Sequence, residues 1–273
     1  MTKEYFELEI KPKKDYEVFL DLIESIIDDA IEESEEKSII IRSEESLDDI
    51  KSAIVKFSEA LNIECEISYE KKDSVDWIKN YQDSIKPVLI GSFYIRPSWE
   101  KSIDDKINIL IDPALAFGSG HHETTSSCIE AIDKYVKKDD ELLDVGTGSG
   151  ILAIASSKKG AKVDICDTDS ICIDSSISNF KINNERVNNF WIGSVNNAKN
   201  KYDVVIANII ADILVMISND LKTSIKEDGT LILSGILDKY ENRVKNSFND
   251  LVLKERIQKN EWLTLIFKKT KEI

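Results

Sequence analysis

A run of glycines and hydroxyl residues, Gly146-Thr147-Gly148-Ser149-Gly150, lies between the apolar segments Leu142 to Val145 and Ile151 to Ala155. This pattern predicts a buried strand, a glycine turn and a helix. Glycine lets the backbone approach a ligand closely, and the first turn of a helix offers unpaired N–H groups. The run, including Gly146, Gly148 and Gly150, is therefore a candidate site for a nucleotide-like ligand.

Two carboxylates accompany this turn. Asp144 precedes its first glycine, and Asp167 ends the next apolar run, Val163 to Cys166. A carboxylate at such a strand end can bind both hydroxyls of a ribose. The spacing G-x-G-x-G is one residue shorter than the dinucleotide fingerprint. Together these features resemble the S-adenosylmethionine site of class I methyltransferases, and a glycine turn without a ligand is the alternative.

Asn208 follows Tyr202 to Ala207, an apolar run typical of a parallel strand that is covered on both faces. Sheets of this class bind ligands beyond the carboxyl ends of their strands. An amide oxygen there can accept a hydrogen bond from a target amine. This contact would aim the lone pair of the amine nitrogen at an electrophilic methyl group. The alternative role is an N-cap for a helix from Asp212 onward, and the two roles are compatible.

The segment from Asp112 to Thr125, DPALAFGSGHHETT, has several interpretations. We expect no metal site, because the adjacent His121 and His122 would rarely converge on one ion and no acid or cysteine lies at ligand spacing. A histidine general base would lack a paired nucleophile in the sequence. A glycine loop that folds over the amino-acid end of a cofactor, next to a hydroxyl-rich helix start, is favoured over a structural loop. The roles of the two histidines stay open.

The elements that position these residues alternate as strand and helix through residues 107–273, the predicted catalytic domain. We expect a Rossmann-like α/β fold with a mostly parallel sheet and an antiparallel strand pair at the C-terminus. The expected strands are 107–111, 141–145, 163–167, 190–192, 202–207, 230–234, 252–258 and 262–267, and the expected helices are 123–136, 151–155, 169–183, 212–225 and 240–248.

Residues 1–72 predict a small α+β domain of ferredoxin-like type. Strands are expected near 5–10, 38–41 and 64–69, with helices at 16–27 and from Ser46, whose predicted capping partner is Asp49. Ile50, Ile54, Phe57 and Leu61 would form the inner face of the second helix. Residues 73–106 are predicted to be a linker and a short β extension. The small domain has no glycine loop or catalytic cluster, so we interpret it as a substrate-recognition domain.

Charge is unevenly distributed in this chain of 273 residues with net charge −15. Residues 1–72 hold 21 Asp and Glu against 10 Lys and Arg, a net charge of −11, which leaves −4 for the remainder. An acidic domain attracts basic partners and repels nucleic acid, so no direct nucleic-acid binding is expected. Four scattered cysteines, no signal peptide and no apolar run long enough to span a bilayer predict a cytoplasmic protein without a membrane partner.

Several motifs resemble one family in order and spacing. DPALAFGSGHHETT, LLDVGTGSGILAIA, CDTD and ANIIADIL are similar to the ribosomal-protein methyltransferases called PrmA, which methylate large-subunit ribosomal protein eleven. The likeness covers most of residues 76–240, and residues 1–72 match mainly in layout. One departure is the segment Asp167-Thr168-Asp169-Ser170, where the family usually reads D-I-D-P.

The resemblance implies S-adenosylmethionine as the cofactor and a lysine or N-terminal amine of that ribosomal protein as the methyl acceptor. It implies cofactor contacts at Thr125, Gly146, Asp167 and Asn208, and a place for Ser194 near the adenine edge. Asn208 would also be the catalytic residue. The alternatives are a class I methyltransferase acting on another protein or on RNA, and a non-catalytic cofactor-binding partner of the ribosome.

Overall fold

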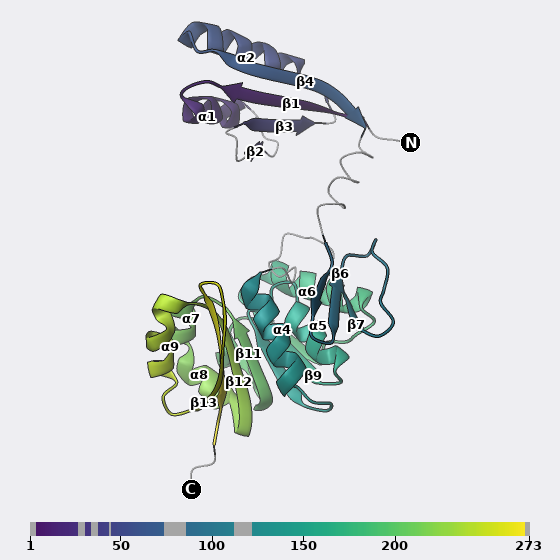
Figure 1. The fold of residues 1–273 in the computed structure, drawn as a ribbon, viewed down its shortest axis with the longest axis vertical. Helices are drawn as coiled ribbons and strands as arrows, with labels where there is room; N and C mark the ends of the chain where they lie inside the picture. Colours follow the sequence, from purple (N-terminus) through teal and green to yellow (C-terminus); the bar gives the residue numbers. More distant parts are fainter. Residues whose placement is uncertain are drawn as a thin grey trace. The chain divides into compact units, whose positions relative to one another are not determined.

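The computed structural model describes residues 4–26, 31–33, 38–43, 45–73, 86–111 and 122–270. Contacts divide the chain into two compact units, Met1–Ile85 and Lys86–Ile273, which are described separately (Figure 1). In the described ranges, no helix has the length and apolar character needed to cross a membrane.

The small unit contains a four-stranded antiparallel sheet in the order β2-β3-β1-β4. Its elements follow the β-α-β-β-α-β order of a ferredoxin-like fold, the predicted type, although the sequence predicted only three of its four strands. The sequence did not predict the short strand β2, because its three residues include two glutamates and show no alternation of apolar and polar side chains. The elements are β1 (Glu4–Pro12), α1 (Tyr16–Ile26), β2 (Ile31–Glu33), β3 (Ile39–Ser43), α2 (Asp48–Leu61) and β4 (Cys65–Asp73).

The core of the small unit consists of apolar residues at alternate positions of the strands and at helical spacing in the helices. Leu8 and Ile10 of β1 are fully buried and pack with Phe19 of α1 and Ile54 of α2.

The predicted start of α2 needs correction. Its N-cap residue is Leu47, and the Ser46 hydroxyl accepts a hydrogen bond from the Asp48 N–H at 3.2 Å. Leu61 at the other end is 42% exposed, outside the inner face.

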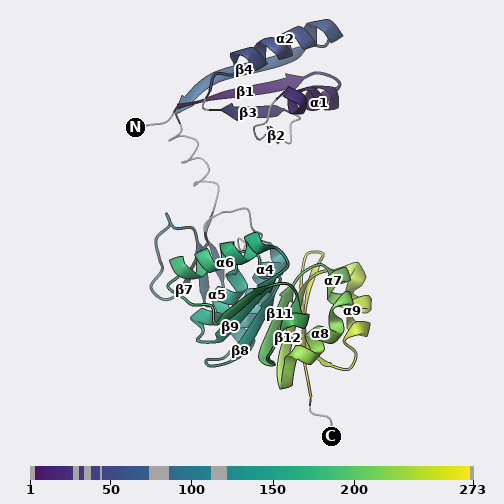
Figure 2. The same cartoon turned by 180° about the vertical axis from the view of Figure 1, so that it is seen from behind.

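The large unit contains a seven-stranded sheet in the order β10-β9-β8-β11-β12-β14-β13 (Figures 1 and 2). Strands β8 to β12 are parallel, and β14 is antiparallel to both β12 and β13. This confirms the predicted Rossmann-like sheet with an antiparallel pair at the C-terminus. The strands are β8 (Glu141–Val145), β9 (Lys162–Asp167), β10 (Asn189–Ile192), β11 (Tyr202–Asn208), β12 (Ile225–Leu237), β13 (Val252–Lys259) and β14 (Trp262–Lys268).

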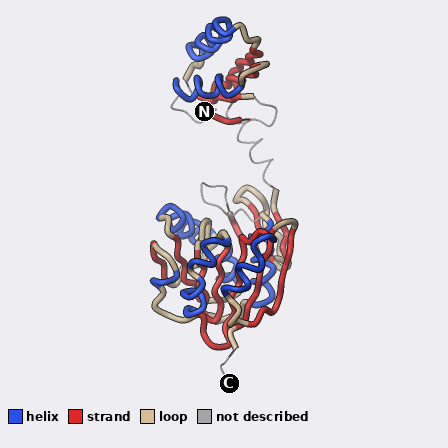
Figure 3. The backbone as a smooth tube through the Cα atoms, turned by 90° about the vertical axis from the view of Figure 1, so that its left-hand side faces the viewer, coloured by secondary structure: helices blue, strands red, loops and turns tan. Residues whose placement is uncertain are grey.

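Helices cover both faces of this sheet (Figures 2 and 3). One face packs against α4 (Glu123–Tyr135), α5 (Ile151–Lys158) and α6 (Ser170–Ile182). The other packs against α7 (Ala211–Met216), α8 (Ser218–Ser224) and α9 (Glu241–Ser247). The one helix predicted over 212–225 is wrong. Two short helices meet at Ile217, and the apolar spacing of Leu214, Ile217 and Leu221 continues across the break, which hides it from the sequence.

A separate three-stranded sheet, β5 (Val88–Ile90), β6 (Phe93–Arg96) and β7 (Ile107–Leu110), also belongs to the large unit. Its buried residues Phe93, Ile95 and Ile109 share one hydrophobic cluster with α4 and α5. The contact division therefore places residues 86–106 with the α/β fold, whereas the sequence assigned them to a linker and β extension. The first part of that linker, residues 74–85, lies outside the described residues.

Candidate functional site

Four adjacent strands end at one edge of the sheet beside the residues that the sequence singled out. Gly146 follows β8, Asp167 ends β9, Ser194 follows β10 after one glycine, and Asn208 ends β11. The chain runs from β8 to β9 and β10 on one side, and β11 lies on the other side of β8. This change of direction is a topological switch point, where open α/β sheets bind their ligands.

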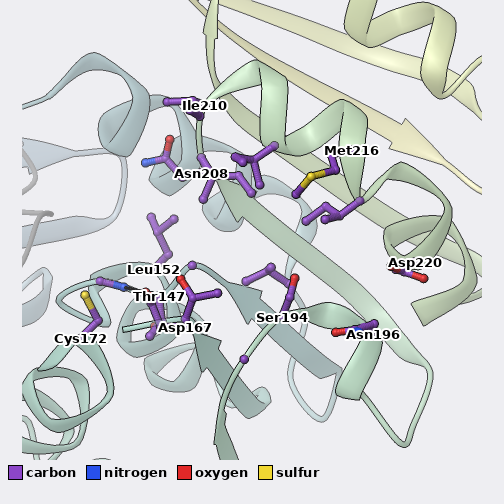
Figure 4. A pocket seen from close by; sticks show the side chains of 18 of the residues that line it. Thr147, Leu152, Asp167, Cys172, Ser194, Asn196, Asn208, Ile210, Met216 and Asp220 are labelled. Atoms are coloured by element: carbon purple, nitrogen blue, oxygen red, sulfur yellow. Dashed lines mark hydrogen bonds between the residues drawn. The ribbon is translucent and has the colours of Figure 1, made fainter. Parts of the chain in front are cut away.

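A pocket of about 680 Å³ opens at this edge (Figure 4). Six of the seven predicted cofactor residues line it: Thr125, Gly146, Gly148, Asp167, Ser194 and Asn208. Gly150 is not among the described lining residues. A side chain at that position would place its Cβ 2.9 Å from the Ser176 hydroxyl oxygen, so Gly150 allows α5 to pack against α6.

Gly146 has a backbone conformation that only glycine adopts readily, with φ of +73°. A Cβ there would also approach the Ile209 side chain to 2.5 Å. The Gly146 N–H donates to the Cys166 carbonyl, 2.9 Å away, which ties the loop to the end of β9. Because Gly146 has no side chain, the space between the end of β8 and Ile209 stays open as part of the pocket.

The Asp167 carboxylate is held by two backbone N–H groups. Gly148 donates to Oδ2 at 3.0 Å, and Asp169 donates to Oδ1 at 3.1 Å. Each oxygen keeps a second lone pair that can accept a further hydrogen bond. The carboxylate thus suits a pair of neighbouring hydroxyl groups, such as those of a ribose.

Thr125 contributes a buried hydroxyl from the first turn of α4. The residue is 1% exposed, and its Oγ1 has no hydrogen-bond partner among the described residues. A buried polar group left in that state costs about 1–3 kcal/mol. Because the residue also lines the pocket, a polar group of a bound ligand would relieve this cost. Together with the Asp167 carboxylate, this hydroxyl fits a ligand that carries both a ribose and a polar chain, as S-adenosylmethionine does.

Asn208 does not cap the helix that follows it. The N-cap residue of α7 is Ile210, which corrects the capping role considered for Asn208. In the described part of the chain, the Asn208 amide makes no side-chain hydrogen bond, and Figure 4 shows it on the pocket wall above Asp167. The amide oxygen is therefore available to an incoming hydrogen-bond donor.

Sequence reasoning missed an apolar wall of the pocket. The wall is formed by Ile209 and by residues at the start and end of α7, including Ile210 and Met216, which are 62% and 71% exposed. Asn196 and Asp220 add polar groups at the end near Ser194 (Figure 4). The sequence analysis gave these apolar residues no role in binding. Their position just after a strand end was the signal that they could face a ligand.

No cysteine of the pocket is prepared for covalent chemistry. Burial, together with the nearby charges of Asp167 and Asp169, raises the pKa of Cys172 to about 11. The thiol therefore stays protonated near neutral pH and is a poor nucleophile. Cys172 is the cysteine that lines the pocket among the residues described.

Asp144 is a buried acid under the glycine loop. It is 1% exposed, and its Oδ2 accepts a hydrogen bond from the Thr147 hydroxyl at 3.0 Å. Burial raises the pKa of this carboxyl to about 7, with the charge of Asp167 adding to the rise and the Thr147 hydrogen bond opposing it. Asp144 thus anchors the loop from below and carries a proton under mildly acidic conditions.

Replacing Asp144 by asparagine should change how stability depends on pH. Between pH ~4 and ~7 the folded chain retains the Asp144 proton that the unfolded chain has released, so this group lowers stability as pH rises. In Asp144→Asn that loss disappears. The unfolding free energy of the variant, relative to the native chain, should rise by up to roughly 1.4 kcal/mol per pH unit in this window. Urea titrations at pH 5, 6, 7 and 8 measure it. A difference that is constant with pH would contradict the prediction.

The histidine-containing segment is described only from His122 onward, so His121 and the predicted glycine loop at 112–121 lie outside the described residues. His122 is the N-cap of α4, where its Nδ1 accepts from the Thr124 N–H at 3.3 Å. Among the described residues, no group of three or more His, Cys, Asp or Glu side chains could hold a metal ion.

Comparisons with known proteins point to one family. The family model "Ribosomal protein L11 methyltransferase (PrmA)" matches residues 13–270. A relative from Nitratiruptor sp. named ribosomal protein L11 methyltransferase is 51% identical, over 98% of this chain and 97% of its own. One of the same name from Campylobacter concisus is 46% identical over 100% of both chains. The crystal structure of a ribosomal protein L11 methylase from Lactobacillus delbrueckii subsp. bulgaricus is 29% identical and aligns with a TM-score of 0.64, over 68% of this chain and 100% of that one.

Proposed function

The chain belongs to the ribosomal protein L11 methyltransferase family, and on this basis we propose that it methylates amines of L11 with S-adenosylmethionine as donor. L11 is the large-subunit protein eleven expected from the sequence motifs. The observation that carries the proposal is the pocket at the switch point, where Asp167 and Asn208 face one cavity. We propose lysine side chains and the N-terminal amine as the acceptors.

The predicted cofactor residues that line the pocket have distinct roles in this proposal. Bound S-adenosylmethionine supplies an electrophilic methyl group on a positively charged sulfur. Asp167 binds the ribose hydroxyls, and the Thr125 hydroxyl and the glycine loop hold the amino-acid end. Ser194 lies toward the adenine. Asn208 accepts a hydrogen bond from the acceptor amine through its amide oxygen and orients the nitrogen lone pair.

The acceptor amine must be neutral before it can react, because an ammonium group has no lone pair. A free lysine has a pKa of ~10.4, and an apolar environment lowers it by disfavouring the charge. The wall of Ile209, Ile210 and Ile213 provides such an environment next to Asn208. Correct alignment of the reacting groups can contribute ~7–11 kcal/mol, so no covalent intermediate is needed.

We assign recognition of the basic substrate to the small unit. On its sheet, Glu7 is already paired with Arg42 at 2.7 Å and with Lys72. In contrast, Asp48 and Asp49 in the first turn of α2 are exposed and form no ion pair within the described residues. Such acids, together with the net charge of −11 over residues 1–72, favour a lysine-rich partner over RNA.

The proposal is tested by incubating purified L11 with this protein and S-adenosylmethionine and measuring the L11 mass. Mass gains in steps of one methyl group, mapped by peptide fragmentation to lysines or the N-terminus, are the expected result. If L11 gains no mass while calorimetry shows cofactor binding, the substrate is another protein or RNA, or the chain is a non-catalytic partner of the ribosome. The same assay on total cellular protein and RNA separates these outcomes.

Neutralising the acids of α2 should weaken substrate binding alone. In Asp48→Asn/Asp49→Asn, we expect KM for L11 to rise about threefold at low salt and less at high salt, because salt screens exposed charges. The affinity for S-adenosylmethionine should not change. The control is Asp104→Asn/Asp105→Asn, the same charge change at exposed positions of the large unit. An equal rise in KM for both pairs would contradict recognition by the small unit.

We also propose a cytoplasmic location. All four cysteines are free thiols, which suits a reducing compartment. Fractionation of cells with an antibody against the chain tests this assignment. Recovery with the membranes or outside the cell would refute it.

A further inference from the structure

The end of the β13–β14 hairpin packs against the first turn of α4, the helix that carries Thr125. β13 ends at Lys259 and β14 begins at Trp262, so the turn consists of two residues. The first of them, Asn260, has a left-handed backbone with φ of +50°. This tight turn brings several polar side chains to the helix start.

Four side-chain contacts join the turn end of the hairpin to α4 and its N-cap residue. The Asn260 amide donates to Glu123 Oε1 at 2.8 Å. The Lys259 ammonium donates to the Ser126 hydroxyl and to Glu130 Oε1, each at 2.7 Å. The Trp262 ring meets the ring of the N-cap residue His122 edge-on, with centroids 5.0 Å apart.

The contacted residues and Thr125 lie on different sides of the helix. Glu123, Ser126 and Glu130 have the i, i+3, i+7 spacing of a single stripe, and Thr125 lies roughly 130° around the helix axis from it. The hairpin therefore contacts α4 from one side while Thr125, whose hydroxyl is buried without a partner among the described residues, lines the pocket on another. A small rotation or shift of this turn would move the hydroxyl away from the ligand.

We propose that Lys259 and Asn260 are positioning residues for the cofactor site, which fix the first turn of α4 and with it the Thr125 hydroxyl. This inference rests on the proposed function, because it assigns Thr125 to the bound cofactor. Lys259 bridges two side chains one helical turn apart, so it restrains both the rotation and the axial position of the helix. Its side chain is 29% exposed, which reduces competition from water.

The test is calorimetric titration with S-adenosylhomocysteine, the product that occupies the same site. Lys259→Met should raise Kd about tenfold, the size expected when one polar contact is misplaced. Lys259→Arg should restore most of the affinity, because it can still donate to Ser126 and Glu130. Lys134→Met is the matched control, since Lys134 joins the other end of α4 to Glu255 of the same hairpin at 2.8 Å. It should leave Kd unchanged. With L11, the loss in Lys259→Met should appear in KM for the cofactor and not in kcat.

A double-mutant cycle separates positioning from general stability. In a Thr125→Val background, Lys259→Met should have no further effect on Kd, because the hydroxyl it positions is gone. A full tenfold loss in that background, or equal Kd values for Lys259→Met and Lys134→Met with equal losses of thermal stability, would overturn the inference. If the native chain does not bind S-adenosylhomocysteine, the proposed function itself is wrong. The titration of the native chain therefore distinguishes this outcome from a failure of the positioning inference alone.

Discussion

Asp167→Ala is expected to weaken S-adenosylmethionine binding by about 100-fold. In the proposed binding mode the variant loses two charge-assisted hydrogen bonds to the ribose. A net loss of about 3 kcal/mol, the lower end of their combined contribution, is roughly a 100-fold change in Kd. It also removes the acceptor of the Gly148 N–H, so the glycine loop loses one of its restraints. Calorimetric titration with the cofactor measures the effect.

The matched variant is Asp167→Asn. Its amide oxygen can still accept from the Gly148 N–H, so the glycine loop should keep this restraint, while the charge and the acceptor for the Asp169 N–H are lost. We expect an intermediate Kd, about tenfold above that of the native chain. If Asp167→Ala binds the cofactor as tightly as the native chain, the ribose assignment is wrong.

Asn208→Ala is expected to reduce kcat by about 100- to 1000-fold, the range found when one preorganised hydrogen-bonding group is removed from an active site. The amide does not cap α7, so its removal should leave the helix intact. The loss should therefore appear in single-turnover rates with L11, together with a smaller rise in the Kd of the cofactor.

Asn208→Asp gives the sharper comparison, because it keeps an acceptor oxygen at the same place. We expect it to retain more activity than Asn208→Ala, especially above the pH at which the acceptor amine loses its proton. The site assignment fails if Asp167→Ala and Asn208→Ala are both as active as the native chain.

The sequence predicted the parallel sheet well because each strand carries its own local signal. The apolar run before Gly146 and the one before Asn208 are both strands of the central sheet. The points at which helices begin and end were harder to predict from the sequence. The apolar spacing of a helix continues through Ile217, and the N-cap of α6 is Asp169, which accepts from the Ile171 N–H at 2.8 Å. Serine and aspartate are equally good caps, so the pair Asp169-Ser170 does not show by itself which residue caps the helix.

The candidate site was predictable as far as strand ends could be recognised. Asp167 and Asn208 end their strands, Ser194 follows one closely, and the sheet order brings the three to one pocket. The part contributed by helices was not predictable. Ile210 and Met216 are of the same apolar types that fill the core, so their residue type does not reveal that they are exposed. Their exposure depends on where α7 lies on the sheet. Contacts such as Lys259 with Ser126 join residues more than 130 positions apart, and no local pattern reports them.

The order of strands at the switch point also has a consequence for folding. Gly146, Asp167 and Ser194 follow β8, β9 and β10, which are consecutive neighbours that pair over short stretches of chain. Asn208 joins them only when β11 pairs on the other side of β8, with Val145 opposite Ala207. Pairing across a long intervening segment is the slower step in assembling a sheet. We therefore expect the strand ends that carry Gly146, Asp167 and Ser194 to assemble before Asn208 joins them.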